Sequence, residues 1–150
     1  MSTAFDFDAW SAQQLARVEQ ALSQWIDPQA PAGLGEAMRY AVLDGGKRLR
    51  PLLVLGARLA VAQGQADPVF DEAALRAACA VEIIHAYSLV HDDMPCMDND
   101  VLRRGKPTVH VRFGEARALL AGDALQALAF EFLTPEHSAI PEALQARLCR

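Results

Sequence analysis

The sequence predicts an all-α domain, and three observations support this prediction. First, alanine and leucine dominate a chain in which 52% of the residues are hydrophobic, while β-branched residues are few. Second, apolar residues recur every three or four positions along most of the chain, which is the spacing of one helix face. Third, prolines and glycines separate these segments, as turns between helices would require. The 150 residues are enough for one domain, residues 1–150, with its own core.

The N-terminal part predicts two helices. Asp8 is the expected N-cap of the first, which ends before Asp27-Pro28. Its apolar stripe consists of Leu15, Val18, Leu22 and Trp25 or Ile26. Residues 28–35 form a loop, and a short helix over 36–43 ends at an Asp-Gly-Gly turn.

A basic turn, Lys-Arg-Leu-Arg, follows at residues 47–50. Pro51 suits the first turn of a helix, so the basic residues lie at a helix N-terminus, where backbone N–H groups and the helix dipole favour an anion. Lys47 and Arg50 are three residues apart and face the same way, whereas Arg48 diverges. Taken alone, such a turn is more typical of a solvated basic surface than of a binding site.

A long helix is predicted from Asp71, its expected N-cap, to about His91. His85, Ser88 and Asp92 fall on one face of it, because seven residues make nearly two helical turns. A lone histidine in such a helix is more often a core residue than a ligand. Here it shares a face with an acid cluster, which favours a functional role.

Pro95 should end or bend this helix within the acid cluster. Proline cannot donate a backbone hydrogen bond and disfavours helical geometry at the residue before it. On an unbroken helix Asp92 and Asp98 would point in different directions, about 120° apart. The break lets Asp98 turn back, so that both carboxylates can reach one set of ions. A loop over 100–112 and helices over 115–133 and 142–150 complete the predicted chain.

The acid cluster and the basic group after it predict a site for phosphate carried with a divalent metal. Adjacent carboxylates repel each other unless a cation neutralises them. Oxygen ligands favour Mg²⁺, or Mn²⁺, over zinc, and the loop lacks the alternating acids and the glycine of a calcium EF-hand. A solvated acidic helix end would explain the acids but not the basic clusters. The cluster contains Asp92, Asp93, Asp98 and Asp100, followed by Arg103, Arg104 and Lys106.

Composition argues against several other classes of protein. The net charge of −5 does not suit a nucleic-acid surface. Three cysteines without a CxxC pair suit a reduced, cytoplasmic protein. We expect no signal peptide and no transmembrane segment, because no apolar run reaches about 18 residues and the most hydrophobic one, over 116–133, carries charged side chains.

Three ordered motifs resemble the short-chain trans-prenyl (polyprenyl) diphosphate synthases, most closely the bacterial farnesyl diphosphate type. The acid cluster with the basic group behind it resembles the first aspartate-rich motif of that family. The run from Gly45 to Pro51 resembles its isopentenyl diphosphate motif, and residues 113–125 are also similar. The resemblance implies the N-terminal helices of an antiparallel bundle of the isoprenoid synthase type.

The resemblance also implies a reaction and a role for each motif residue. An allylic diphosphate, dimethylallyl or geranyl, would condense head-to-tail with isopentenyl diphosphate to give farnesyl diphosphate. Asp92 and Asp98 match the metal-binding acids, with Asp93 supporting them from behind, and Arg103 matches the residue that holds the allylic diphosphate. The residues that match binders of isopentenyl diphosphate are Lys47, Arg50, His85 and Arg104.

Product length is implied to depend on the wall below Asp92, formed by Tyr87 and Ser88. An aromatic residue five positions before the first acid suggests a C15 product in this family, although helical geometry alone would place Ser88 beneath the acid. The alternatives are a geranylgeranyl diphosphate synthase and a non-catalytic subunit or fragment of a heteromeric synthase. The family's second aspartate-rich motif has no counterpart after Asp123, so we expect these residues to be the N-terminal half of a homodimeric enzyme and to be inactive alone.

Overall fold

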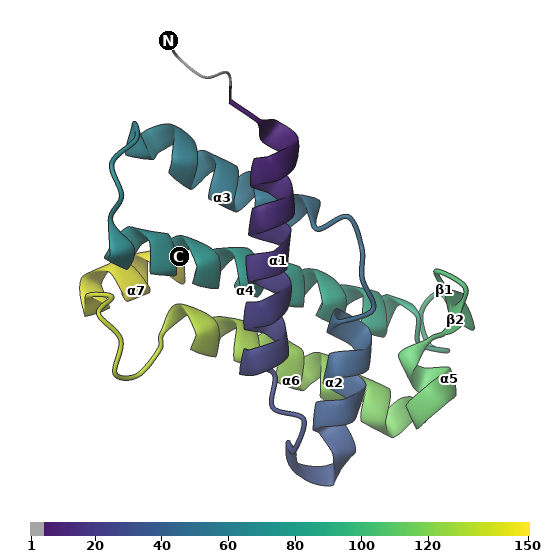
Figure 1. Ribbon diagram of the computed structural model, residues 1–150. Helices are drawn as coiled ribbons and strands as arrows, with labels where there is room; N and C mark the ends of the chain where they lie inside the picture. The colour runs from purple at the N-terminus through teal and green to yellow at the C-terminus, as the bar shows by residue number, and fades with distance from the viewer. Residues whose placement is uncertain (1–4) are drawn as a thin grey trace.

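The computed structural model describes residues 5–150, and their all-α architecture confirms the predicted fold class (Figure 1). Among residues 5–150 the only strands form one short antiparallel ribbon with two residues in each strand. In this ribbon Leu102 pairs with Pro107, and Arg103 pairs with Lys106. The elements in chain order are α1 (Phe7–Trp25), the 3₁₀ turn η1 (Pro31–Gly33), α2 (Leu34–Val42), α3 (Leu49–Ala62), α4 (Pro68–Asp92), β1 (Leu102–Arg103), β2 (Lys106–Pro107), α5 (Val109–Phe113), α6 (Glu115–Leu133) and α7 (Glu142–Leu148).

The helix α4 lies at the centre of the bundle. It packs most extensively against α6, which runs antiparallel beside it, and against α3, while α1 crosses them (Figure 1). The core side chains that are fully buried between these helices include Val18, Leu22, Ile26, Ile83 and Leu125. Each buried side chain of this size stabilises the fold by about 1.5–3 kcal/mol before entropy is counted, so these contacts hold α1, α4 and α6 together.

Two predicted helix caps are wrong, the first by two residues and the second by four. The first helix is capped by Asp6 rather than Asp8, because the Asp6 carboxylate accepts a hydrogen bond from the Ala9 amide at 2.9 Å. Asp8 lies within the first turn instead, where the helix dipole favours an acid.

The cap of α4 is Asp67 rather than Asp71. Asp67 accepts hydrogen bonds from the amides of Val69 and Phe70, and Pro68 occupies the first helical position, which suits its fixed φ. Asp71 lies inside the helix and forms an ion pair of 2.9 Å with Arg58 of α3.

Among the described residues, α4 is long and apolar enough by length and composition to cross a membrane. This corrects the expectation that no apolar run has that length. The core helix of a soluble protein passes the same test, and α4 packs against α3 and α6 at the centre of this bundle.

Candidate active site

The helix α4 ends inside the acid cluster, as the sequence predicts. Its last residue is Asp92, after which the chain turns back so that the amide of Asp98 donates a hydrogen bond to the carbonyl of Asp92 at 2.9 Å. Both side chains are exposed, and among residues 5–150 neither forms an ion pair. The turn after Asp92 therefore brings the backbones of the two predicted metal-binding acids together and leaves both carboxylates open to solvent.

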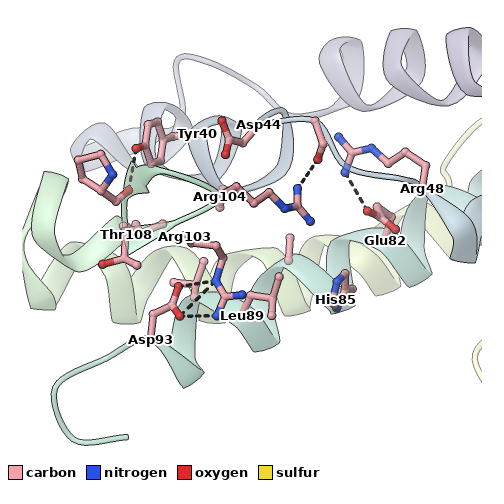
Figure 2. A pocket seen from close by; sticks show the side chains of 16 residues that line it. Tyr40, Asp44, Arg48, Glu82, His85, Leu89, Asp93, Arg103, Arg104 and Thr108 are labelled. Carbon is pink, nitrogen blue, oxygen red and sulfur yellow. Dashed lines mark hydrogen bonds and ion pairs between the residues drawn. The ribbon is translucent and has the colours of Figure 1, made fainter. Parts of the chain in front are cut away.

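Asp93 behaves differently from its neighbours. It is only 3% exposed, and both of its carboxylate oxygens accept hydrogen bonds from Arg103, at 2.9 Å from Nε and 2.5 Å from Nη2 (Figure 2). The hydrogen bonds that Arg103 donates to this carboxylate raise the pKa of Arg103. A bidentate pair of this kind fixes the plane of the guanidinium, so Asp93 orients Arg103 beside the acid cluster.

The basic turn splits into a buried residue and two exposed ones. Arg48 is 5% exposed and turns into the protein, whereas Lys47 and Arg50 are exposed, which confirms that Arg48 diverges from the other two. The Arg48 guanidinium donates to Glu19 at 2.6 Å and to Glu82 at 2.8 Å. Burial opposes its charge, but these two carboxylates outweigh that effect and raise the pKa of Arg48.

The four residues predicted to bind isopentenyl diphosphate line one open pocket of about 480 Å³: Lys47, Arg50, His85 and Arg104. They come from three separate segments, namely the basic turn, the middle of α4 and the ribbon. Burial, and then the charge of Arg50, lower the pKa of His85, so its neutral form is favoured there. The pocket thus has fixed positive charges and a histidine that donates one ring N–H, a set suited to a diphosphate.

Arg104 closes this pocket from the ribbon side. Its Nη1 donates a hydrogen bond to the carbonyl of Gly45 at 2.6 Å (Figure 2). Gly46 has a φ of 132°, and a Cβ at that position would lie 2.8 Å from the Arg104 guanidinium. Only glycine therefore allows the arginine to lie this close to the turn.

Further contacts, which no pattern in the sequence indicates, tie the ribbon to the end of α2. Lys106 forms an ion pair with Asp44. The Tyr40 hydroxyl, labelled in Figure 2, donates to the carbonyl of Pro107 at 2.7 Å. These partners lie more than 60 residues apart in the chain, so no local spacing could reveal them. They hold the ribbon, and with it Arg103 and Arg104, over the Asp-Gly-Gly turn.

The two residues predicted to control product length lie in different surroundings. Ser88 lines an apolar pocket of about 410 Å³ between α4 and α6, together with side chains such as Ile84, Phe130 and Leu133. Tyr87 instead packs edge-on against the ring of His91, with 5.3 Å between ring centroids. The structure therefore places Ser88, but not Tyr87, on the wall of an apolar pocket among those described.

The loop that carries the acid cluster after α4, here called the acid loop, suits a hard cation that also binds water and phosphate oxygens. Among residues 5–150 no group of three or more His, Cys, Asp or Glu side chains is close enough to hold a metal ion. Three exposed carboxylates lie at the loop, and they belong to Asp92, Asp98 and Asp100. Such a set fits Mg²⁺ or Mn²⁺, which retain water molecules and bind phosphate oxygens as well.

Comparison with known proteins agrees with these motifs. The family model described as "Polyprenyl synthetase" matches residues 31–147. Geranylgeranyl pyrophosphate synthase 12 of Arabidopsis thaliana is 52% identical over 131 residues, which cover 87% of this chain and 35% of the relative. Farnesyl diphosphate synthase of Geobacillus stearothermophilus is 49% identical over 138 residues, covering 91% of this chain and 44% of the relative.

Solved structures give the same result. The apo structure of an FPP/GFPP synthase from Zymomonas mobilis has a TM-score of 0.77 and 50% identity, with coverage of 94% of this chain and 49% of that one. Geranyltranstransferase from Thermotoga maritima has a TM-score of 0.73 and 42% identity, with coverage of 83% and 45%. The chain thus spans less than half the length of these relatives. It belongs to the polyprenyl synthetase family of prenyltransferases.

Proposed function

We propose that this chain supplies the first aspartate-rich motif and the isopentenyl diphosphate pocket of a synthase that makes farnesyl diphosphate. The observation that supports this most is the separation of two charged sites at one end of α4. Asp92 and Asp98 form an exposed acidic site, and beside it Lys47, Arg50 and Arg104 of the ribbon form a basic one. Two sites suit a reaction with two diphosphate substrates, whereas one metal-phosphate site would suffice for a single substrate.

In the proposed reaction the allylic C–O bond breaks and diphosphate leaves with the bonding electrons. The double bond of isopentenyl diphosphate then attacks the allylic cation, and the new cation loses a proton to the released diphosphate. Arg103, held by Asp93, stabilises the negative charge that develops on the leaving group. Lys47, Arg50, His85 and Arg104 hold isopentenyl diphosphate in place.

Asp92 and Asp98 would hold the divalent ion, Mg²⁺ or Mn²⁺. When bound, such an ion neutralises phosphate oxygens and so assists departure of the diphosphate. No side chain is needed as a general base in this scheme. Both acids are already open to solvent, so binding need not break an existing ion pair of theirs among residues 5–150.

The second candidate product is geranylgeranyl diphosphate. Several similar plant proteins carry that name, including one called the large subunit 2 of a heterodimeric geranylgeranyl pyrophosphate synthase, which is 50% identical over 130 residues. We favour a C15 product because Tyr87 precedes Asp92 by five residues, as the family resemblance implies. Product analysis distinguishes the two candidates.

A homodimer and a cytoplasmic location remain predictions. The names of several plant relatives place those proteins in chloroplasts, and one relative is named as part of a heterodimer. Sedimentation of the purified protein and imaging of a tagged copy in its own cells test these two predictions.

The test is a condensation assay with geranyl diphosphate, labelled isopentenyl diphosphate and Mg²⁺. Because this chain spans less than half of its relatives, we expect turnover only from a polypeptide that also supplies the remaining length, and none from residues 1–150 alone. In the complete polypeptide, Asp92→Asn and Asp98→Asn should each lower kcat by about 100-fold or more, since each removes a metal ligand.

Asp71→Asn is the matched control for these two variants. It removes an acid on the same helix, at its ion pair with Arg58 and remote from the acid loop, so kcat should stay within about twofold of the wild type. Undiminished turnover in both acid-loop variants would contradict the proposed metal site, and robust product from residues 1–150 would contradict the expected inactivity.

A further inference from the structure

A buried ion-pair cluster lies directly behind the basic pocket. Arg48 is its centre, and three of its nitrogens donate to acceptors on three helices: Glu19 of α1 at 2.6 Å, Glu82 of α4 at 2.8 Å and the carbonyl of Val42 at the end of α2 at 2.7 Å. One guanidinium therefore fastens the turn that begins α3 to the rest of the bundle. All three guanidinium nitrogens already donate within the protein and Arg48 is buried, so it is poorly placed to act as a ligand for phosphate itself.

The backbone at Arg48 is in an unusual conformation. Its φ is 47° and its ψ is 36°, the left-handed region that non-glycine residues rarely adopt, and it is the N-cap of α3. A residue keeps such a conformation only when its surroundings hold it there. The flanking residues Lys47 and Arg50 are exposed and line the open pocket, so their direction depends on the turn that Arg48 fixes.

Electrostatics alone does not explain why Glu82, a buried carboxylate, lies beside a pocket for an anion. Its side chain is 6% exposed, it lines the same pocket as His85, and its Oε2 has no hydrogen-bond partner in the part of the chain that the structure describes. A buried carboxylate repels an anion nearby. Its presence beside a pocket for diphosphate indicates that it does something there that outweighs this repulsion.

We infer that Glu19, Arg48 and Glu82 form a positioning triad that aims Lys47 and Arg50 at isopentenyl diphosphate. This inference rests on the proposed function of the pocket. The triad residues do not touch the substrate; they hold the turn in the one conformation that presents both cations to the same diphosphate. The two glutamates can affect binding in opposite ways. If they mainly repel the anion, neutralising them should tighten binding, and if they mainly hold the turn, neutralising them should weaken it.

The test is isothermal titration of isopentenyl diphosphate, without metal, into the complete polypeptide, which carries these 150 residues and the remaining length of its relatives. Glu82→Gln and Glu19→Gln each neutralise a carboxylate with little change of shape. If charge alone mattered, both would tighten binding of the anion. Positioning predicts weaker binding, by about tenfold for Glu82→Gln and less for the partly exposed Glu19, because a displaced cation loses its contact.

Glu72→Gln is the matched control. Glu72 forms an ion pair of 2.9 Å with Arg76, and its side chain is 38% exposed compared with 40% for Glu19, but it does not line the pocket. Glu72→Gln should leave the dissociation constant for isopentenyl diphosphate within about twofold of the wild-type value, because screening weakens the effect of distant surface charges. Circular dichroism confirms that each variant keeps its helices.

Arg48→Lys provides a second variant if Glu82→Gln does not fold. Lysine keeps the charge but cannot reach three acceptors with a fixed planar group, so it should also weaken binding. In the complete enzyme the same variants should raise KM for isopentenyl diphosphate while KM for the allylic substrate stays within about twofold, a split that general destabilisation would not produce.

The outcomes distinguish failure of the proposed pocket from failure of the triad alone. Absence of binding by the complete wild-type polypeptide would overturn the proposed pocket, and the triad with it. Binding by the wild type that is unchanged or tighter in Glu82→Gln and Glu19→Gln would overturn the triad and leave the pocket in place.

Discussion

Two neighbouring arginines show how one backbone conformation directs adjacent side chains to different parts of the fold. Arg104 has a φ of 52°, in the left-handed region, which turns the chain sharply between β1 and β2. Arg103 therefore reaches Asp93 beside the acid loop, and Arg104 reaches the carbonyl of Gly45 beside the basic turn. The adjacent pair assigned to different substrates in the sequence does lie toward different sites in the fold.

The wall that limits product length gives a prediction for single residues. Tyr87→Ala should lengthen the product from C15 toward C20, because it removes an aromatic ring from the wall that the family resemblance implies. The readout is chromatography of the dephosphorylated products of the complete enzyme. Tyr87→Phe keeps the ring and is the control, with an unchanged product distribution.

The structure offers a competing residue for the same role. Ser88 lines the apolar pocket between α4 and α6, whereas Tyr87 packs on His91. Ser88→Phe should fill that pocket and shorten the product. An effect of Ser88→Phe together with no change in Tyr87→Ala would assign the wall to Ser88 and contradict the stopper role of Tyr87.

Sequence reasoning found the residues of the basic pocket but not the residue that orients them. Lys47, Arg50 and His85 stand in motifs with recognisable spacing, and the fold brings them together. For Arg48 the sequence predicted only that its side chain points away from Lys47 and Arg50, and it indicated no role. Its partners, Glu19 and Glu82, are 29 and 34 residues away, and contacts across that distance depend on how helices pack.

At the scale of helices, chain breaks were predicted better than caps. Pro95 correctly marked the end of α4, because a missing N–H is a local property that packing cannot restore. The caps at Asp6 and Asp67 were missed because each helix has a second aspartate in its first turn, at Asp8 and Asp71. Either residue of each pair satisfies the same pattern, and only the hydrogen bonds decide between them.

The packing of α4 on α6 gives a prediction for these two elements. A Cβ added at Gly122 of α6 would lie 2.1 Å from Nε2 of His91. That ring is held by Tyr87 and by a contact of 3.0 Å between Nε2 and the carbonyl of Leu119, so it cannot move without losing contacts. Gly122→Ala should therefore lower the free energy of unfolding by about 1–3 kcal/mol, measured by urea denaturation.

A double-mutant cycle provides the control for this prediction. His91→Ala removes the ring that the new methyl group would meet, so Gly122→Ala in that background should cost less or even stabilise, since alanine is favoured over glycine in a helix by about 1 kcal/mol. Stabilisation by Gly122→Ala in the wild-type background would show that the His91 ring moves aside freely.

For the whole molecule, the composition predicted the all-α class correctly, and the reason is physical. Helices rich in alanine and leucine need only one apolar face each, and the chain has such faces throughout. The arrangement around α4 needed the structure, because α4 is apolar on several sides and its sequence does not say which neighbour covers which side. Both charged sites lie near one end of that central helix, so the packing of the core positions the chemistry.

The cysteines give a prediction that depends on the integrity of the whole fold. Cys79 lies on α4 and is fully buried, and burial raises the pKa of its thiol to about 12, whereas Cys96 is exposed and Cys149 is partly buried. A rise from about 9 to about 12 lowers the thiolate fraction near neutral pH about a thousandfold. An aromatic disulfide reagent should therefore modify two thiols in the native protein and the third only after unfolding.

A variant with Cys96→Ser and Cys149→Ser isolates the buried thiol and makes this measurement direct. Its labelling rate in increasing urea should rise in parallel with the loss of helical circular dichroism, because Cys79 becomes accessible only when the helices around α4 separate. The same variant in folding buffer should remain unlabelled over the time in which Cys96 of the wild type reacts completely. Rapid labelling under those conditions would mean that the core around α4 opens locally, without unfolding of the bundle.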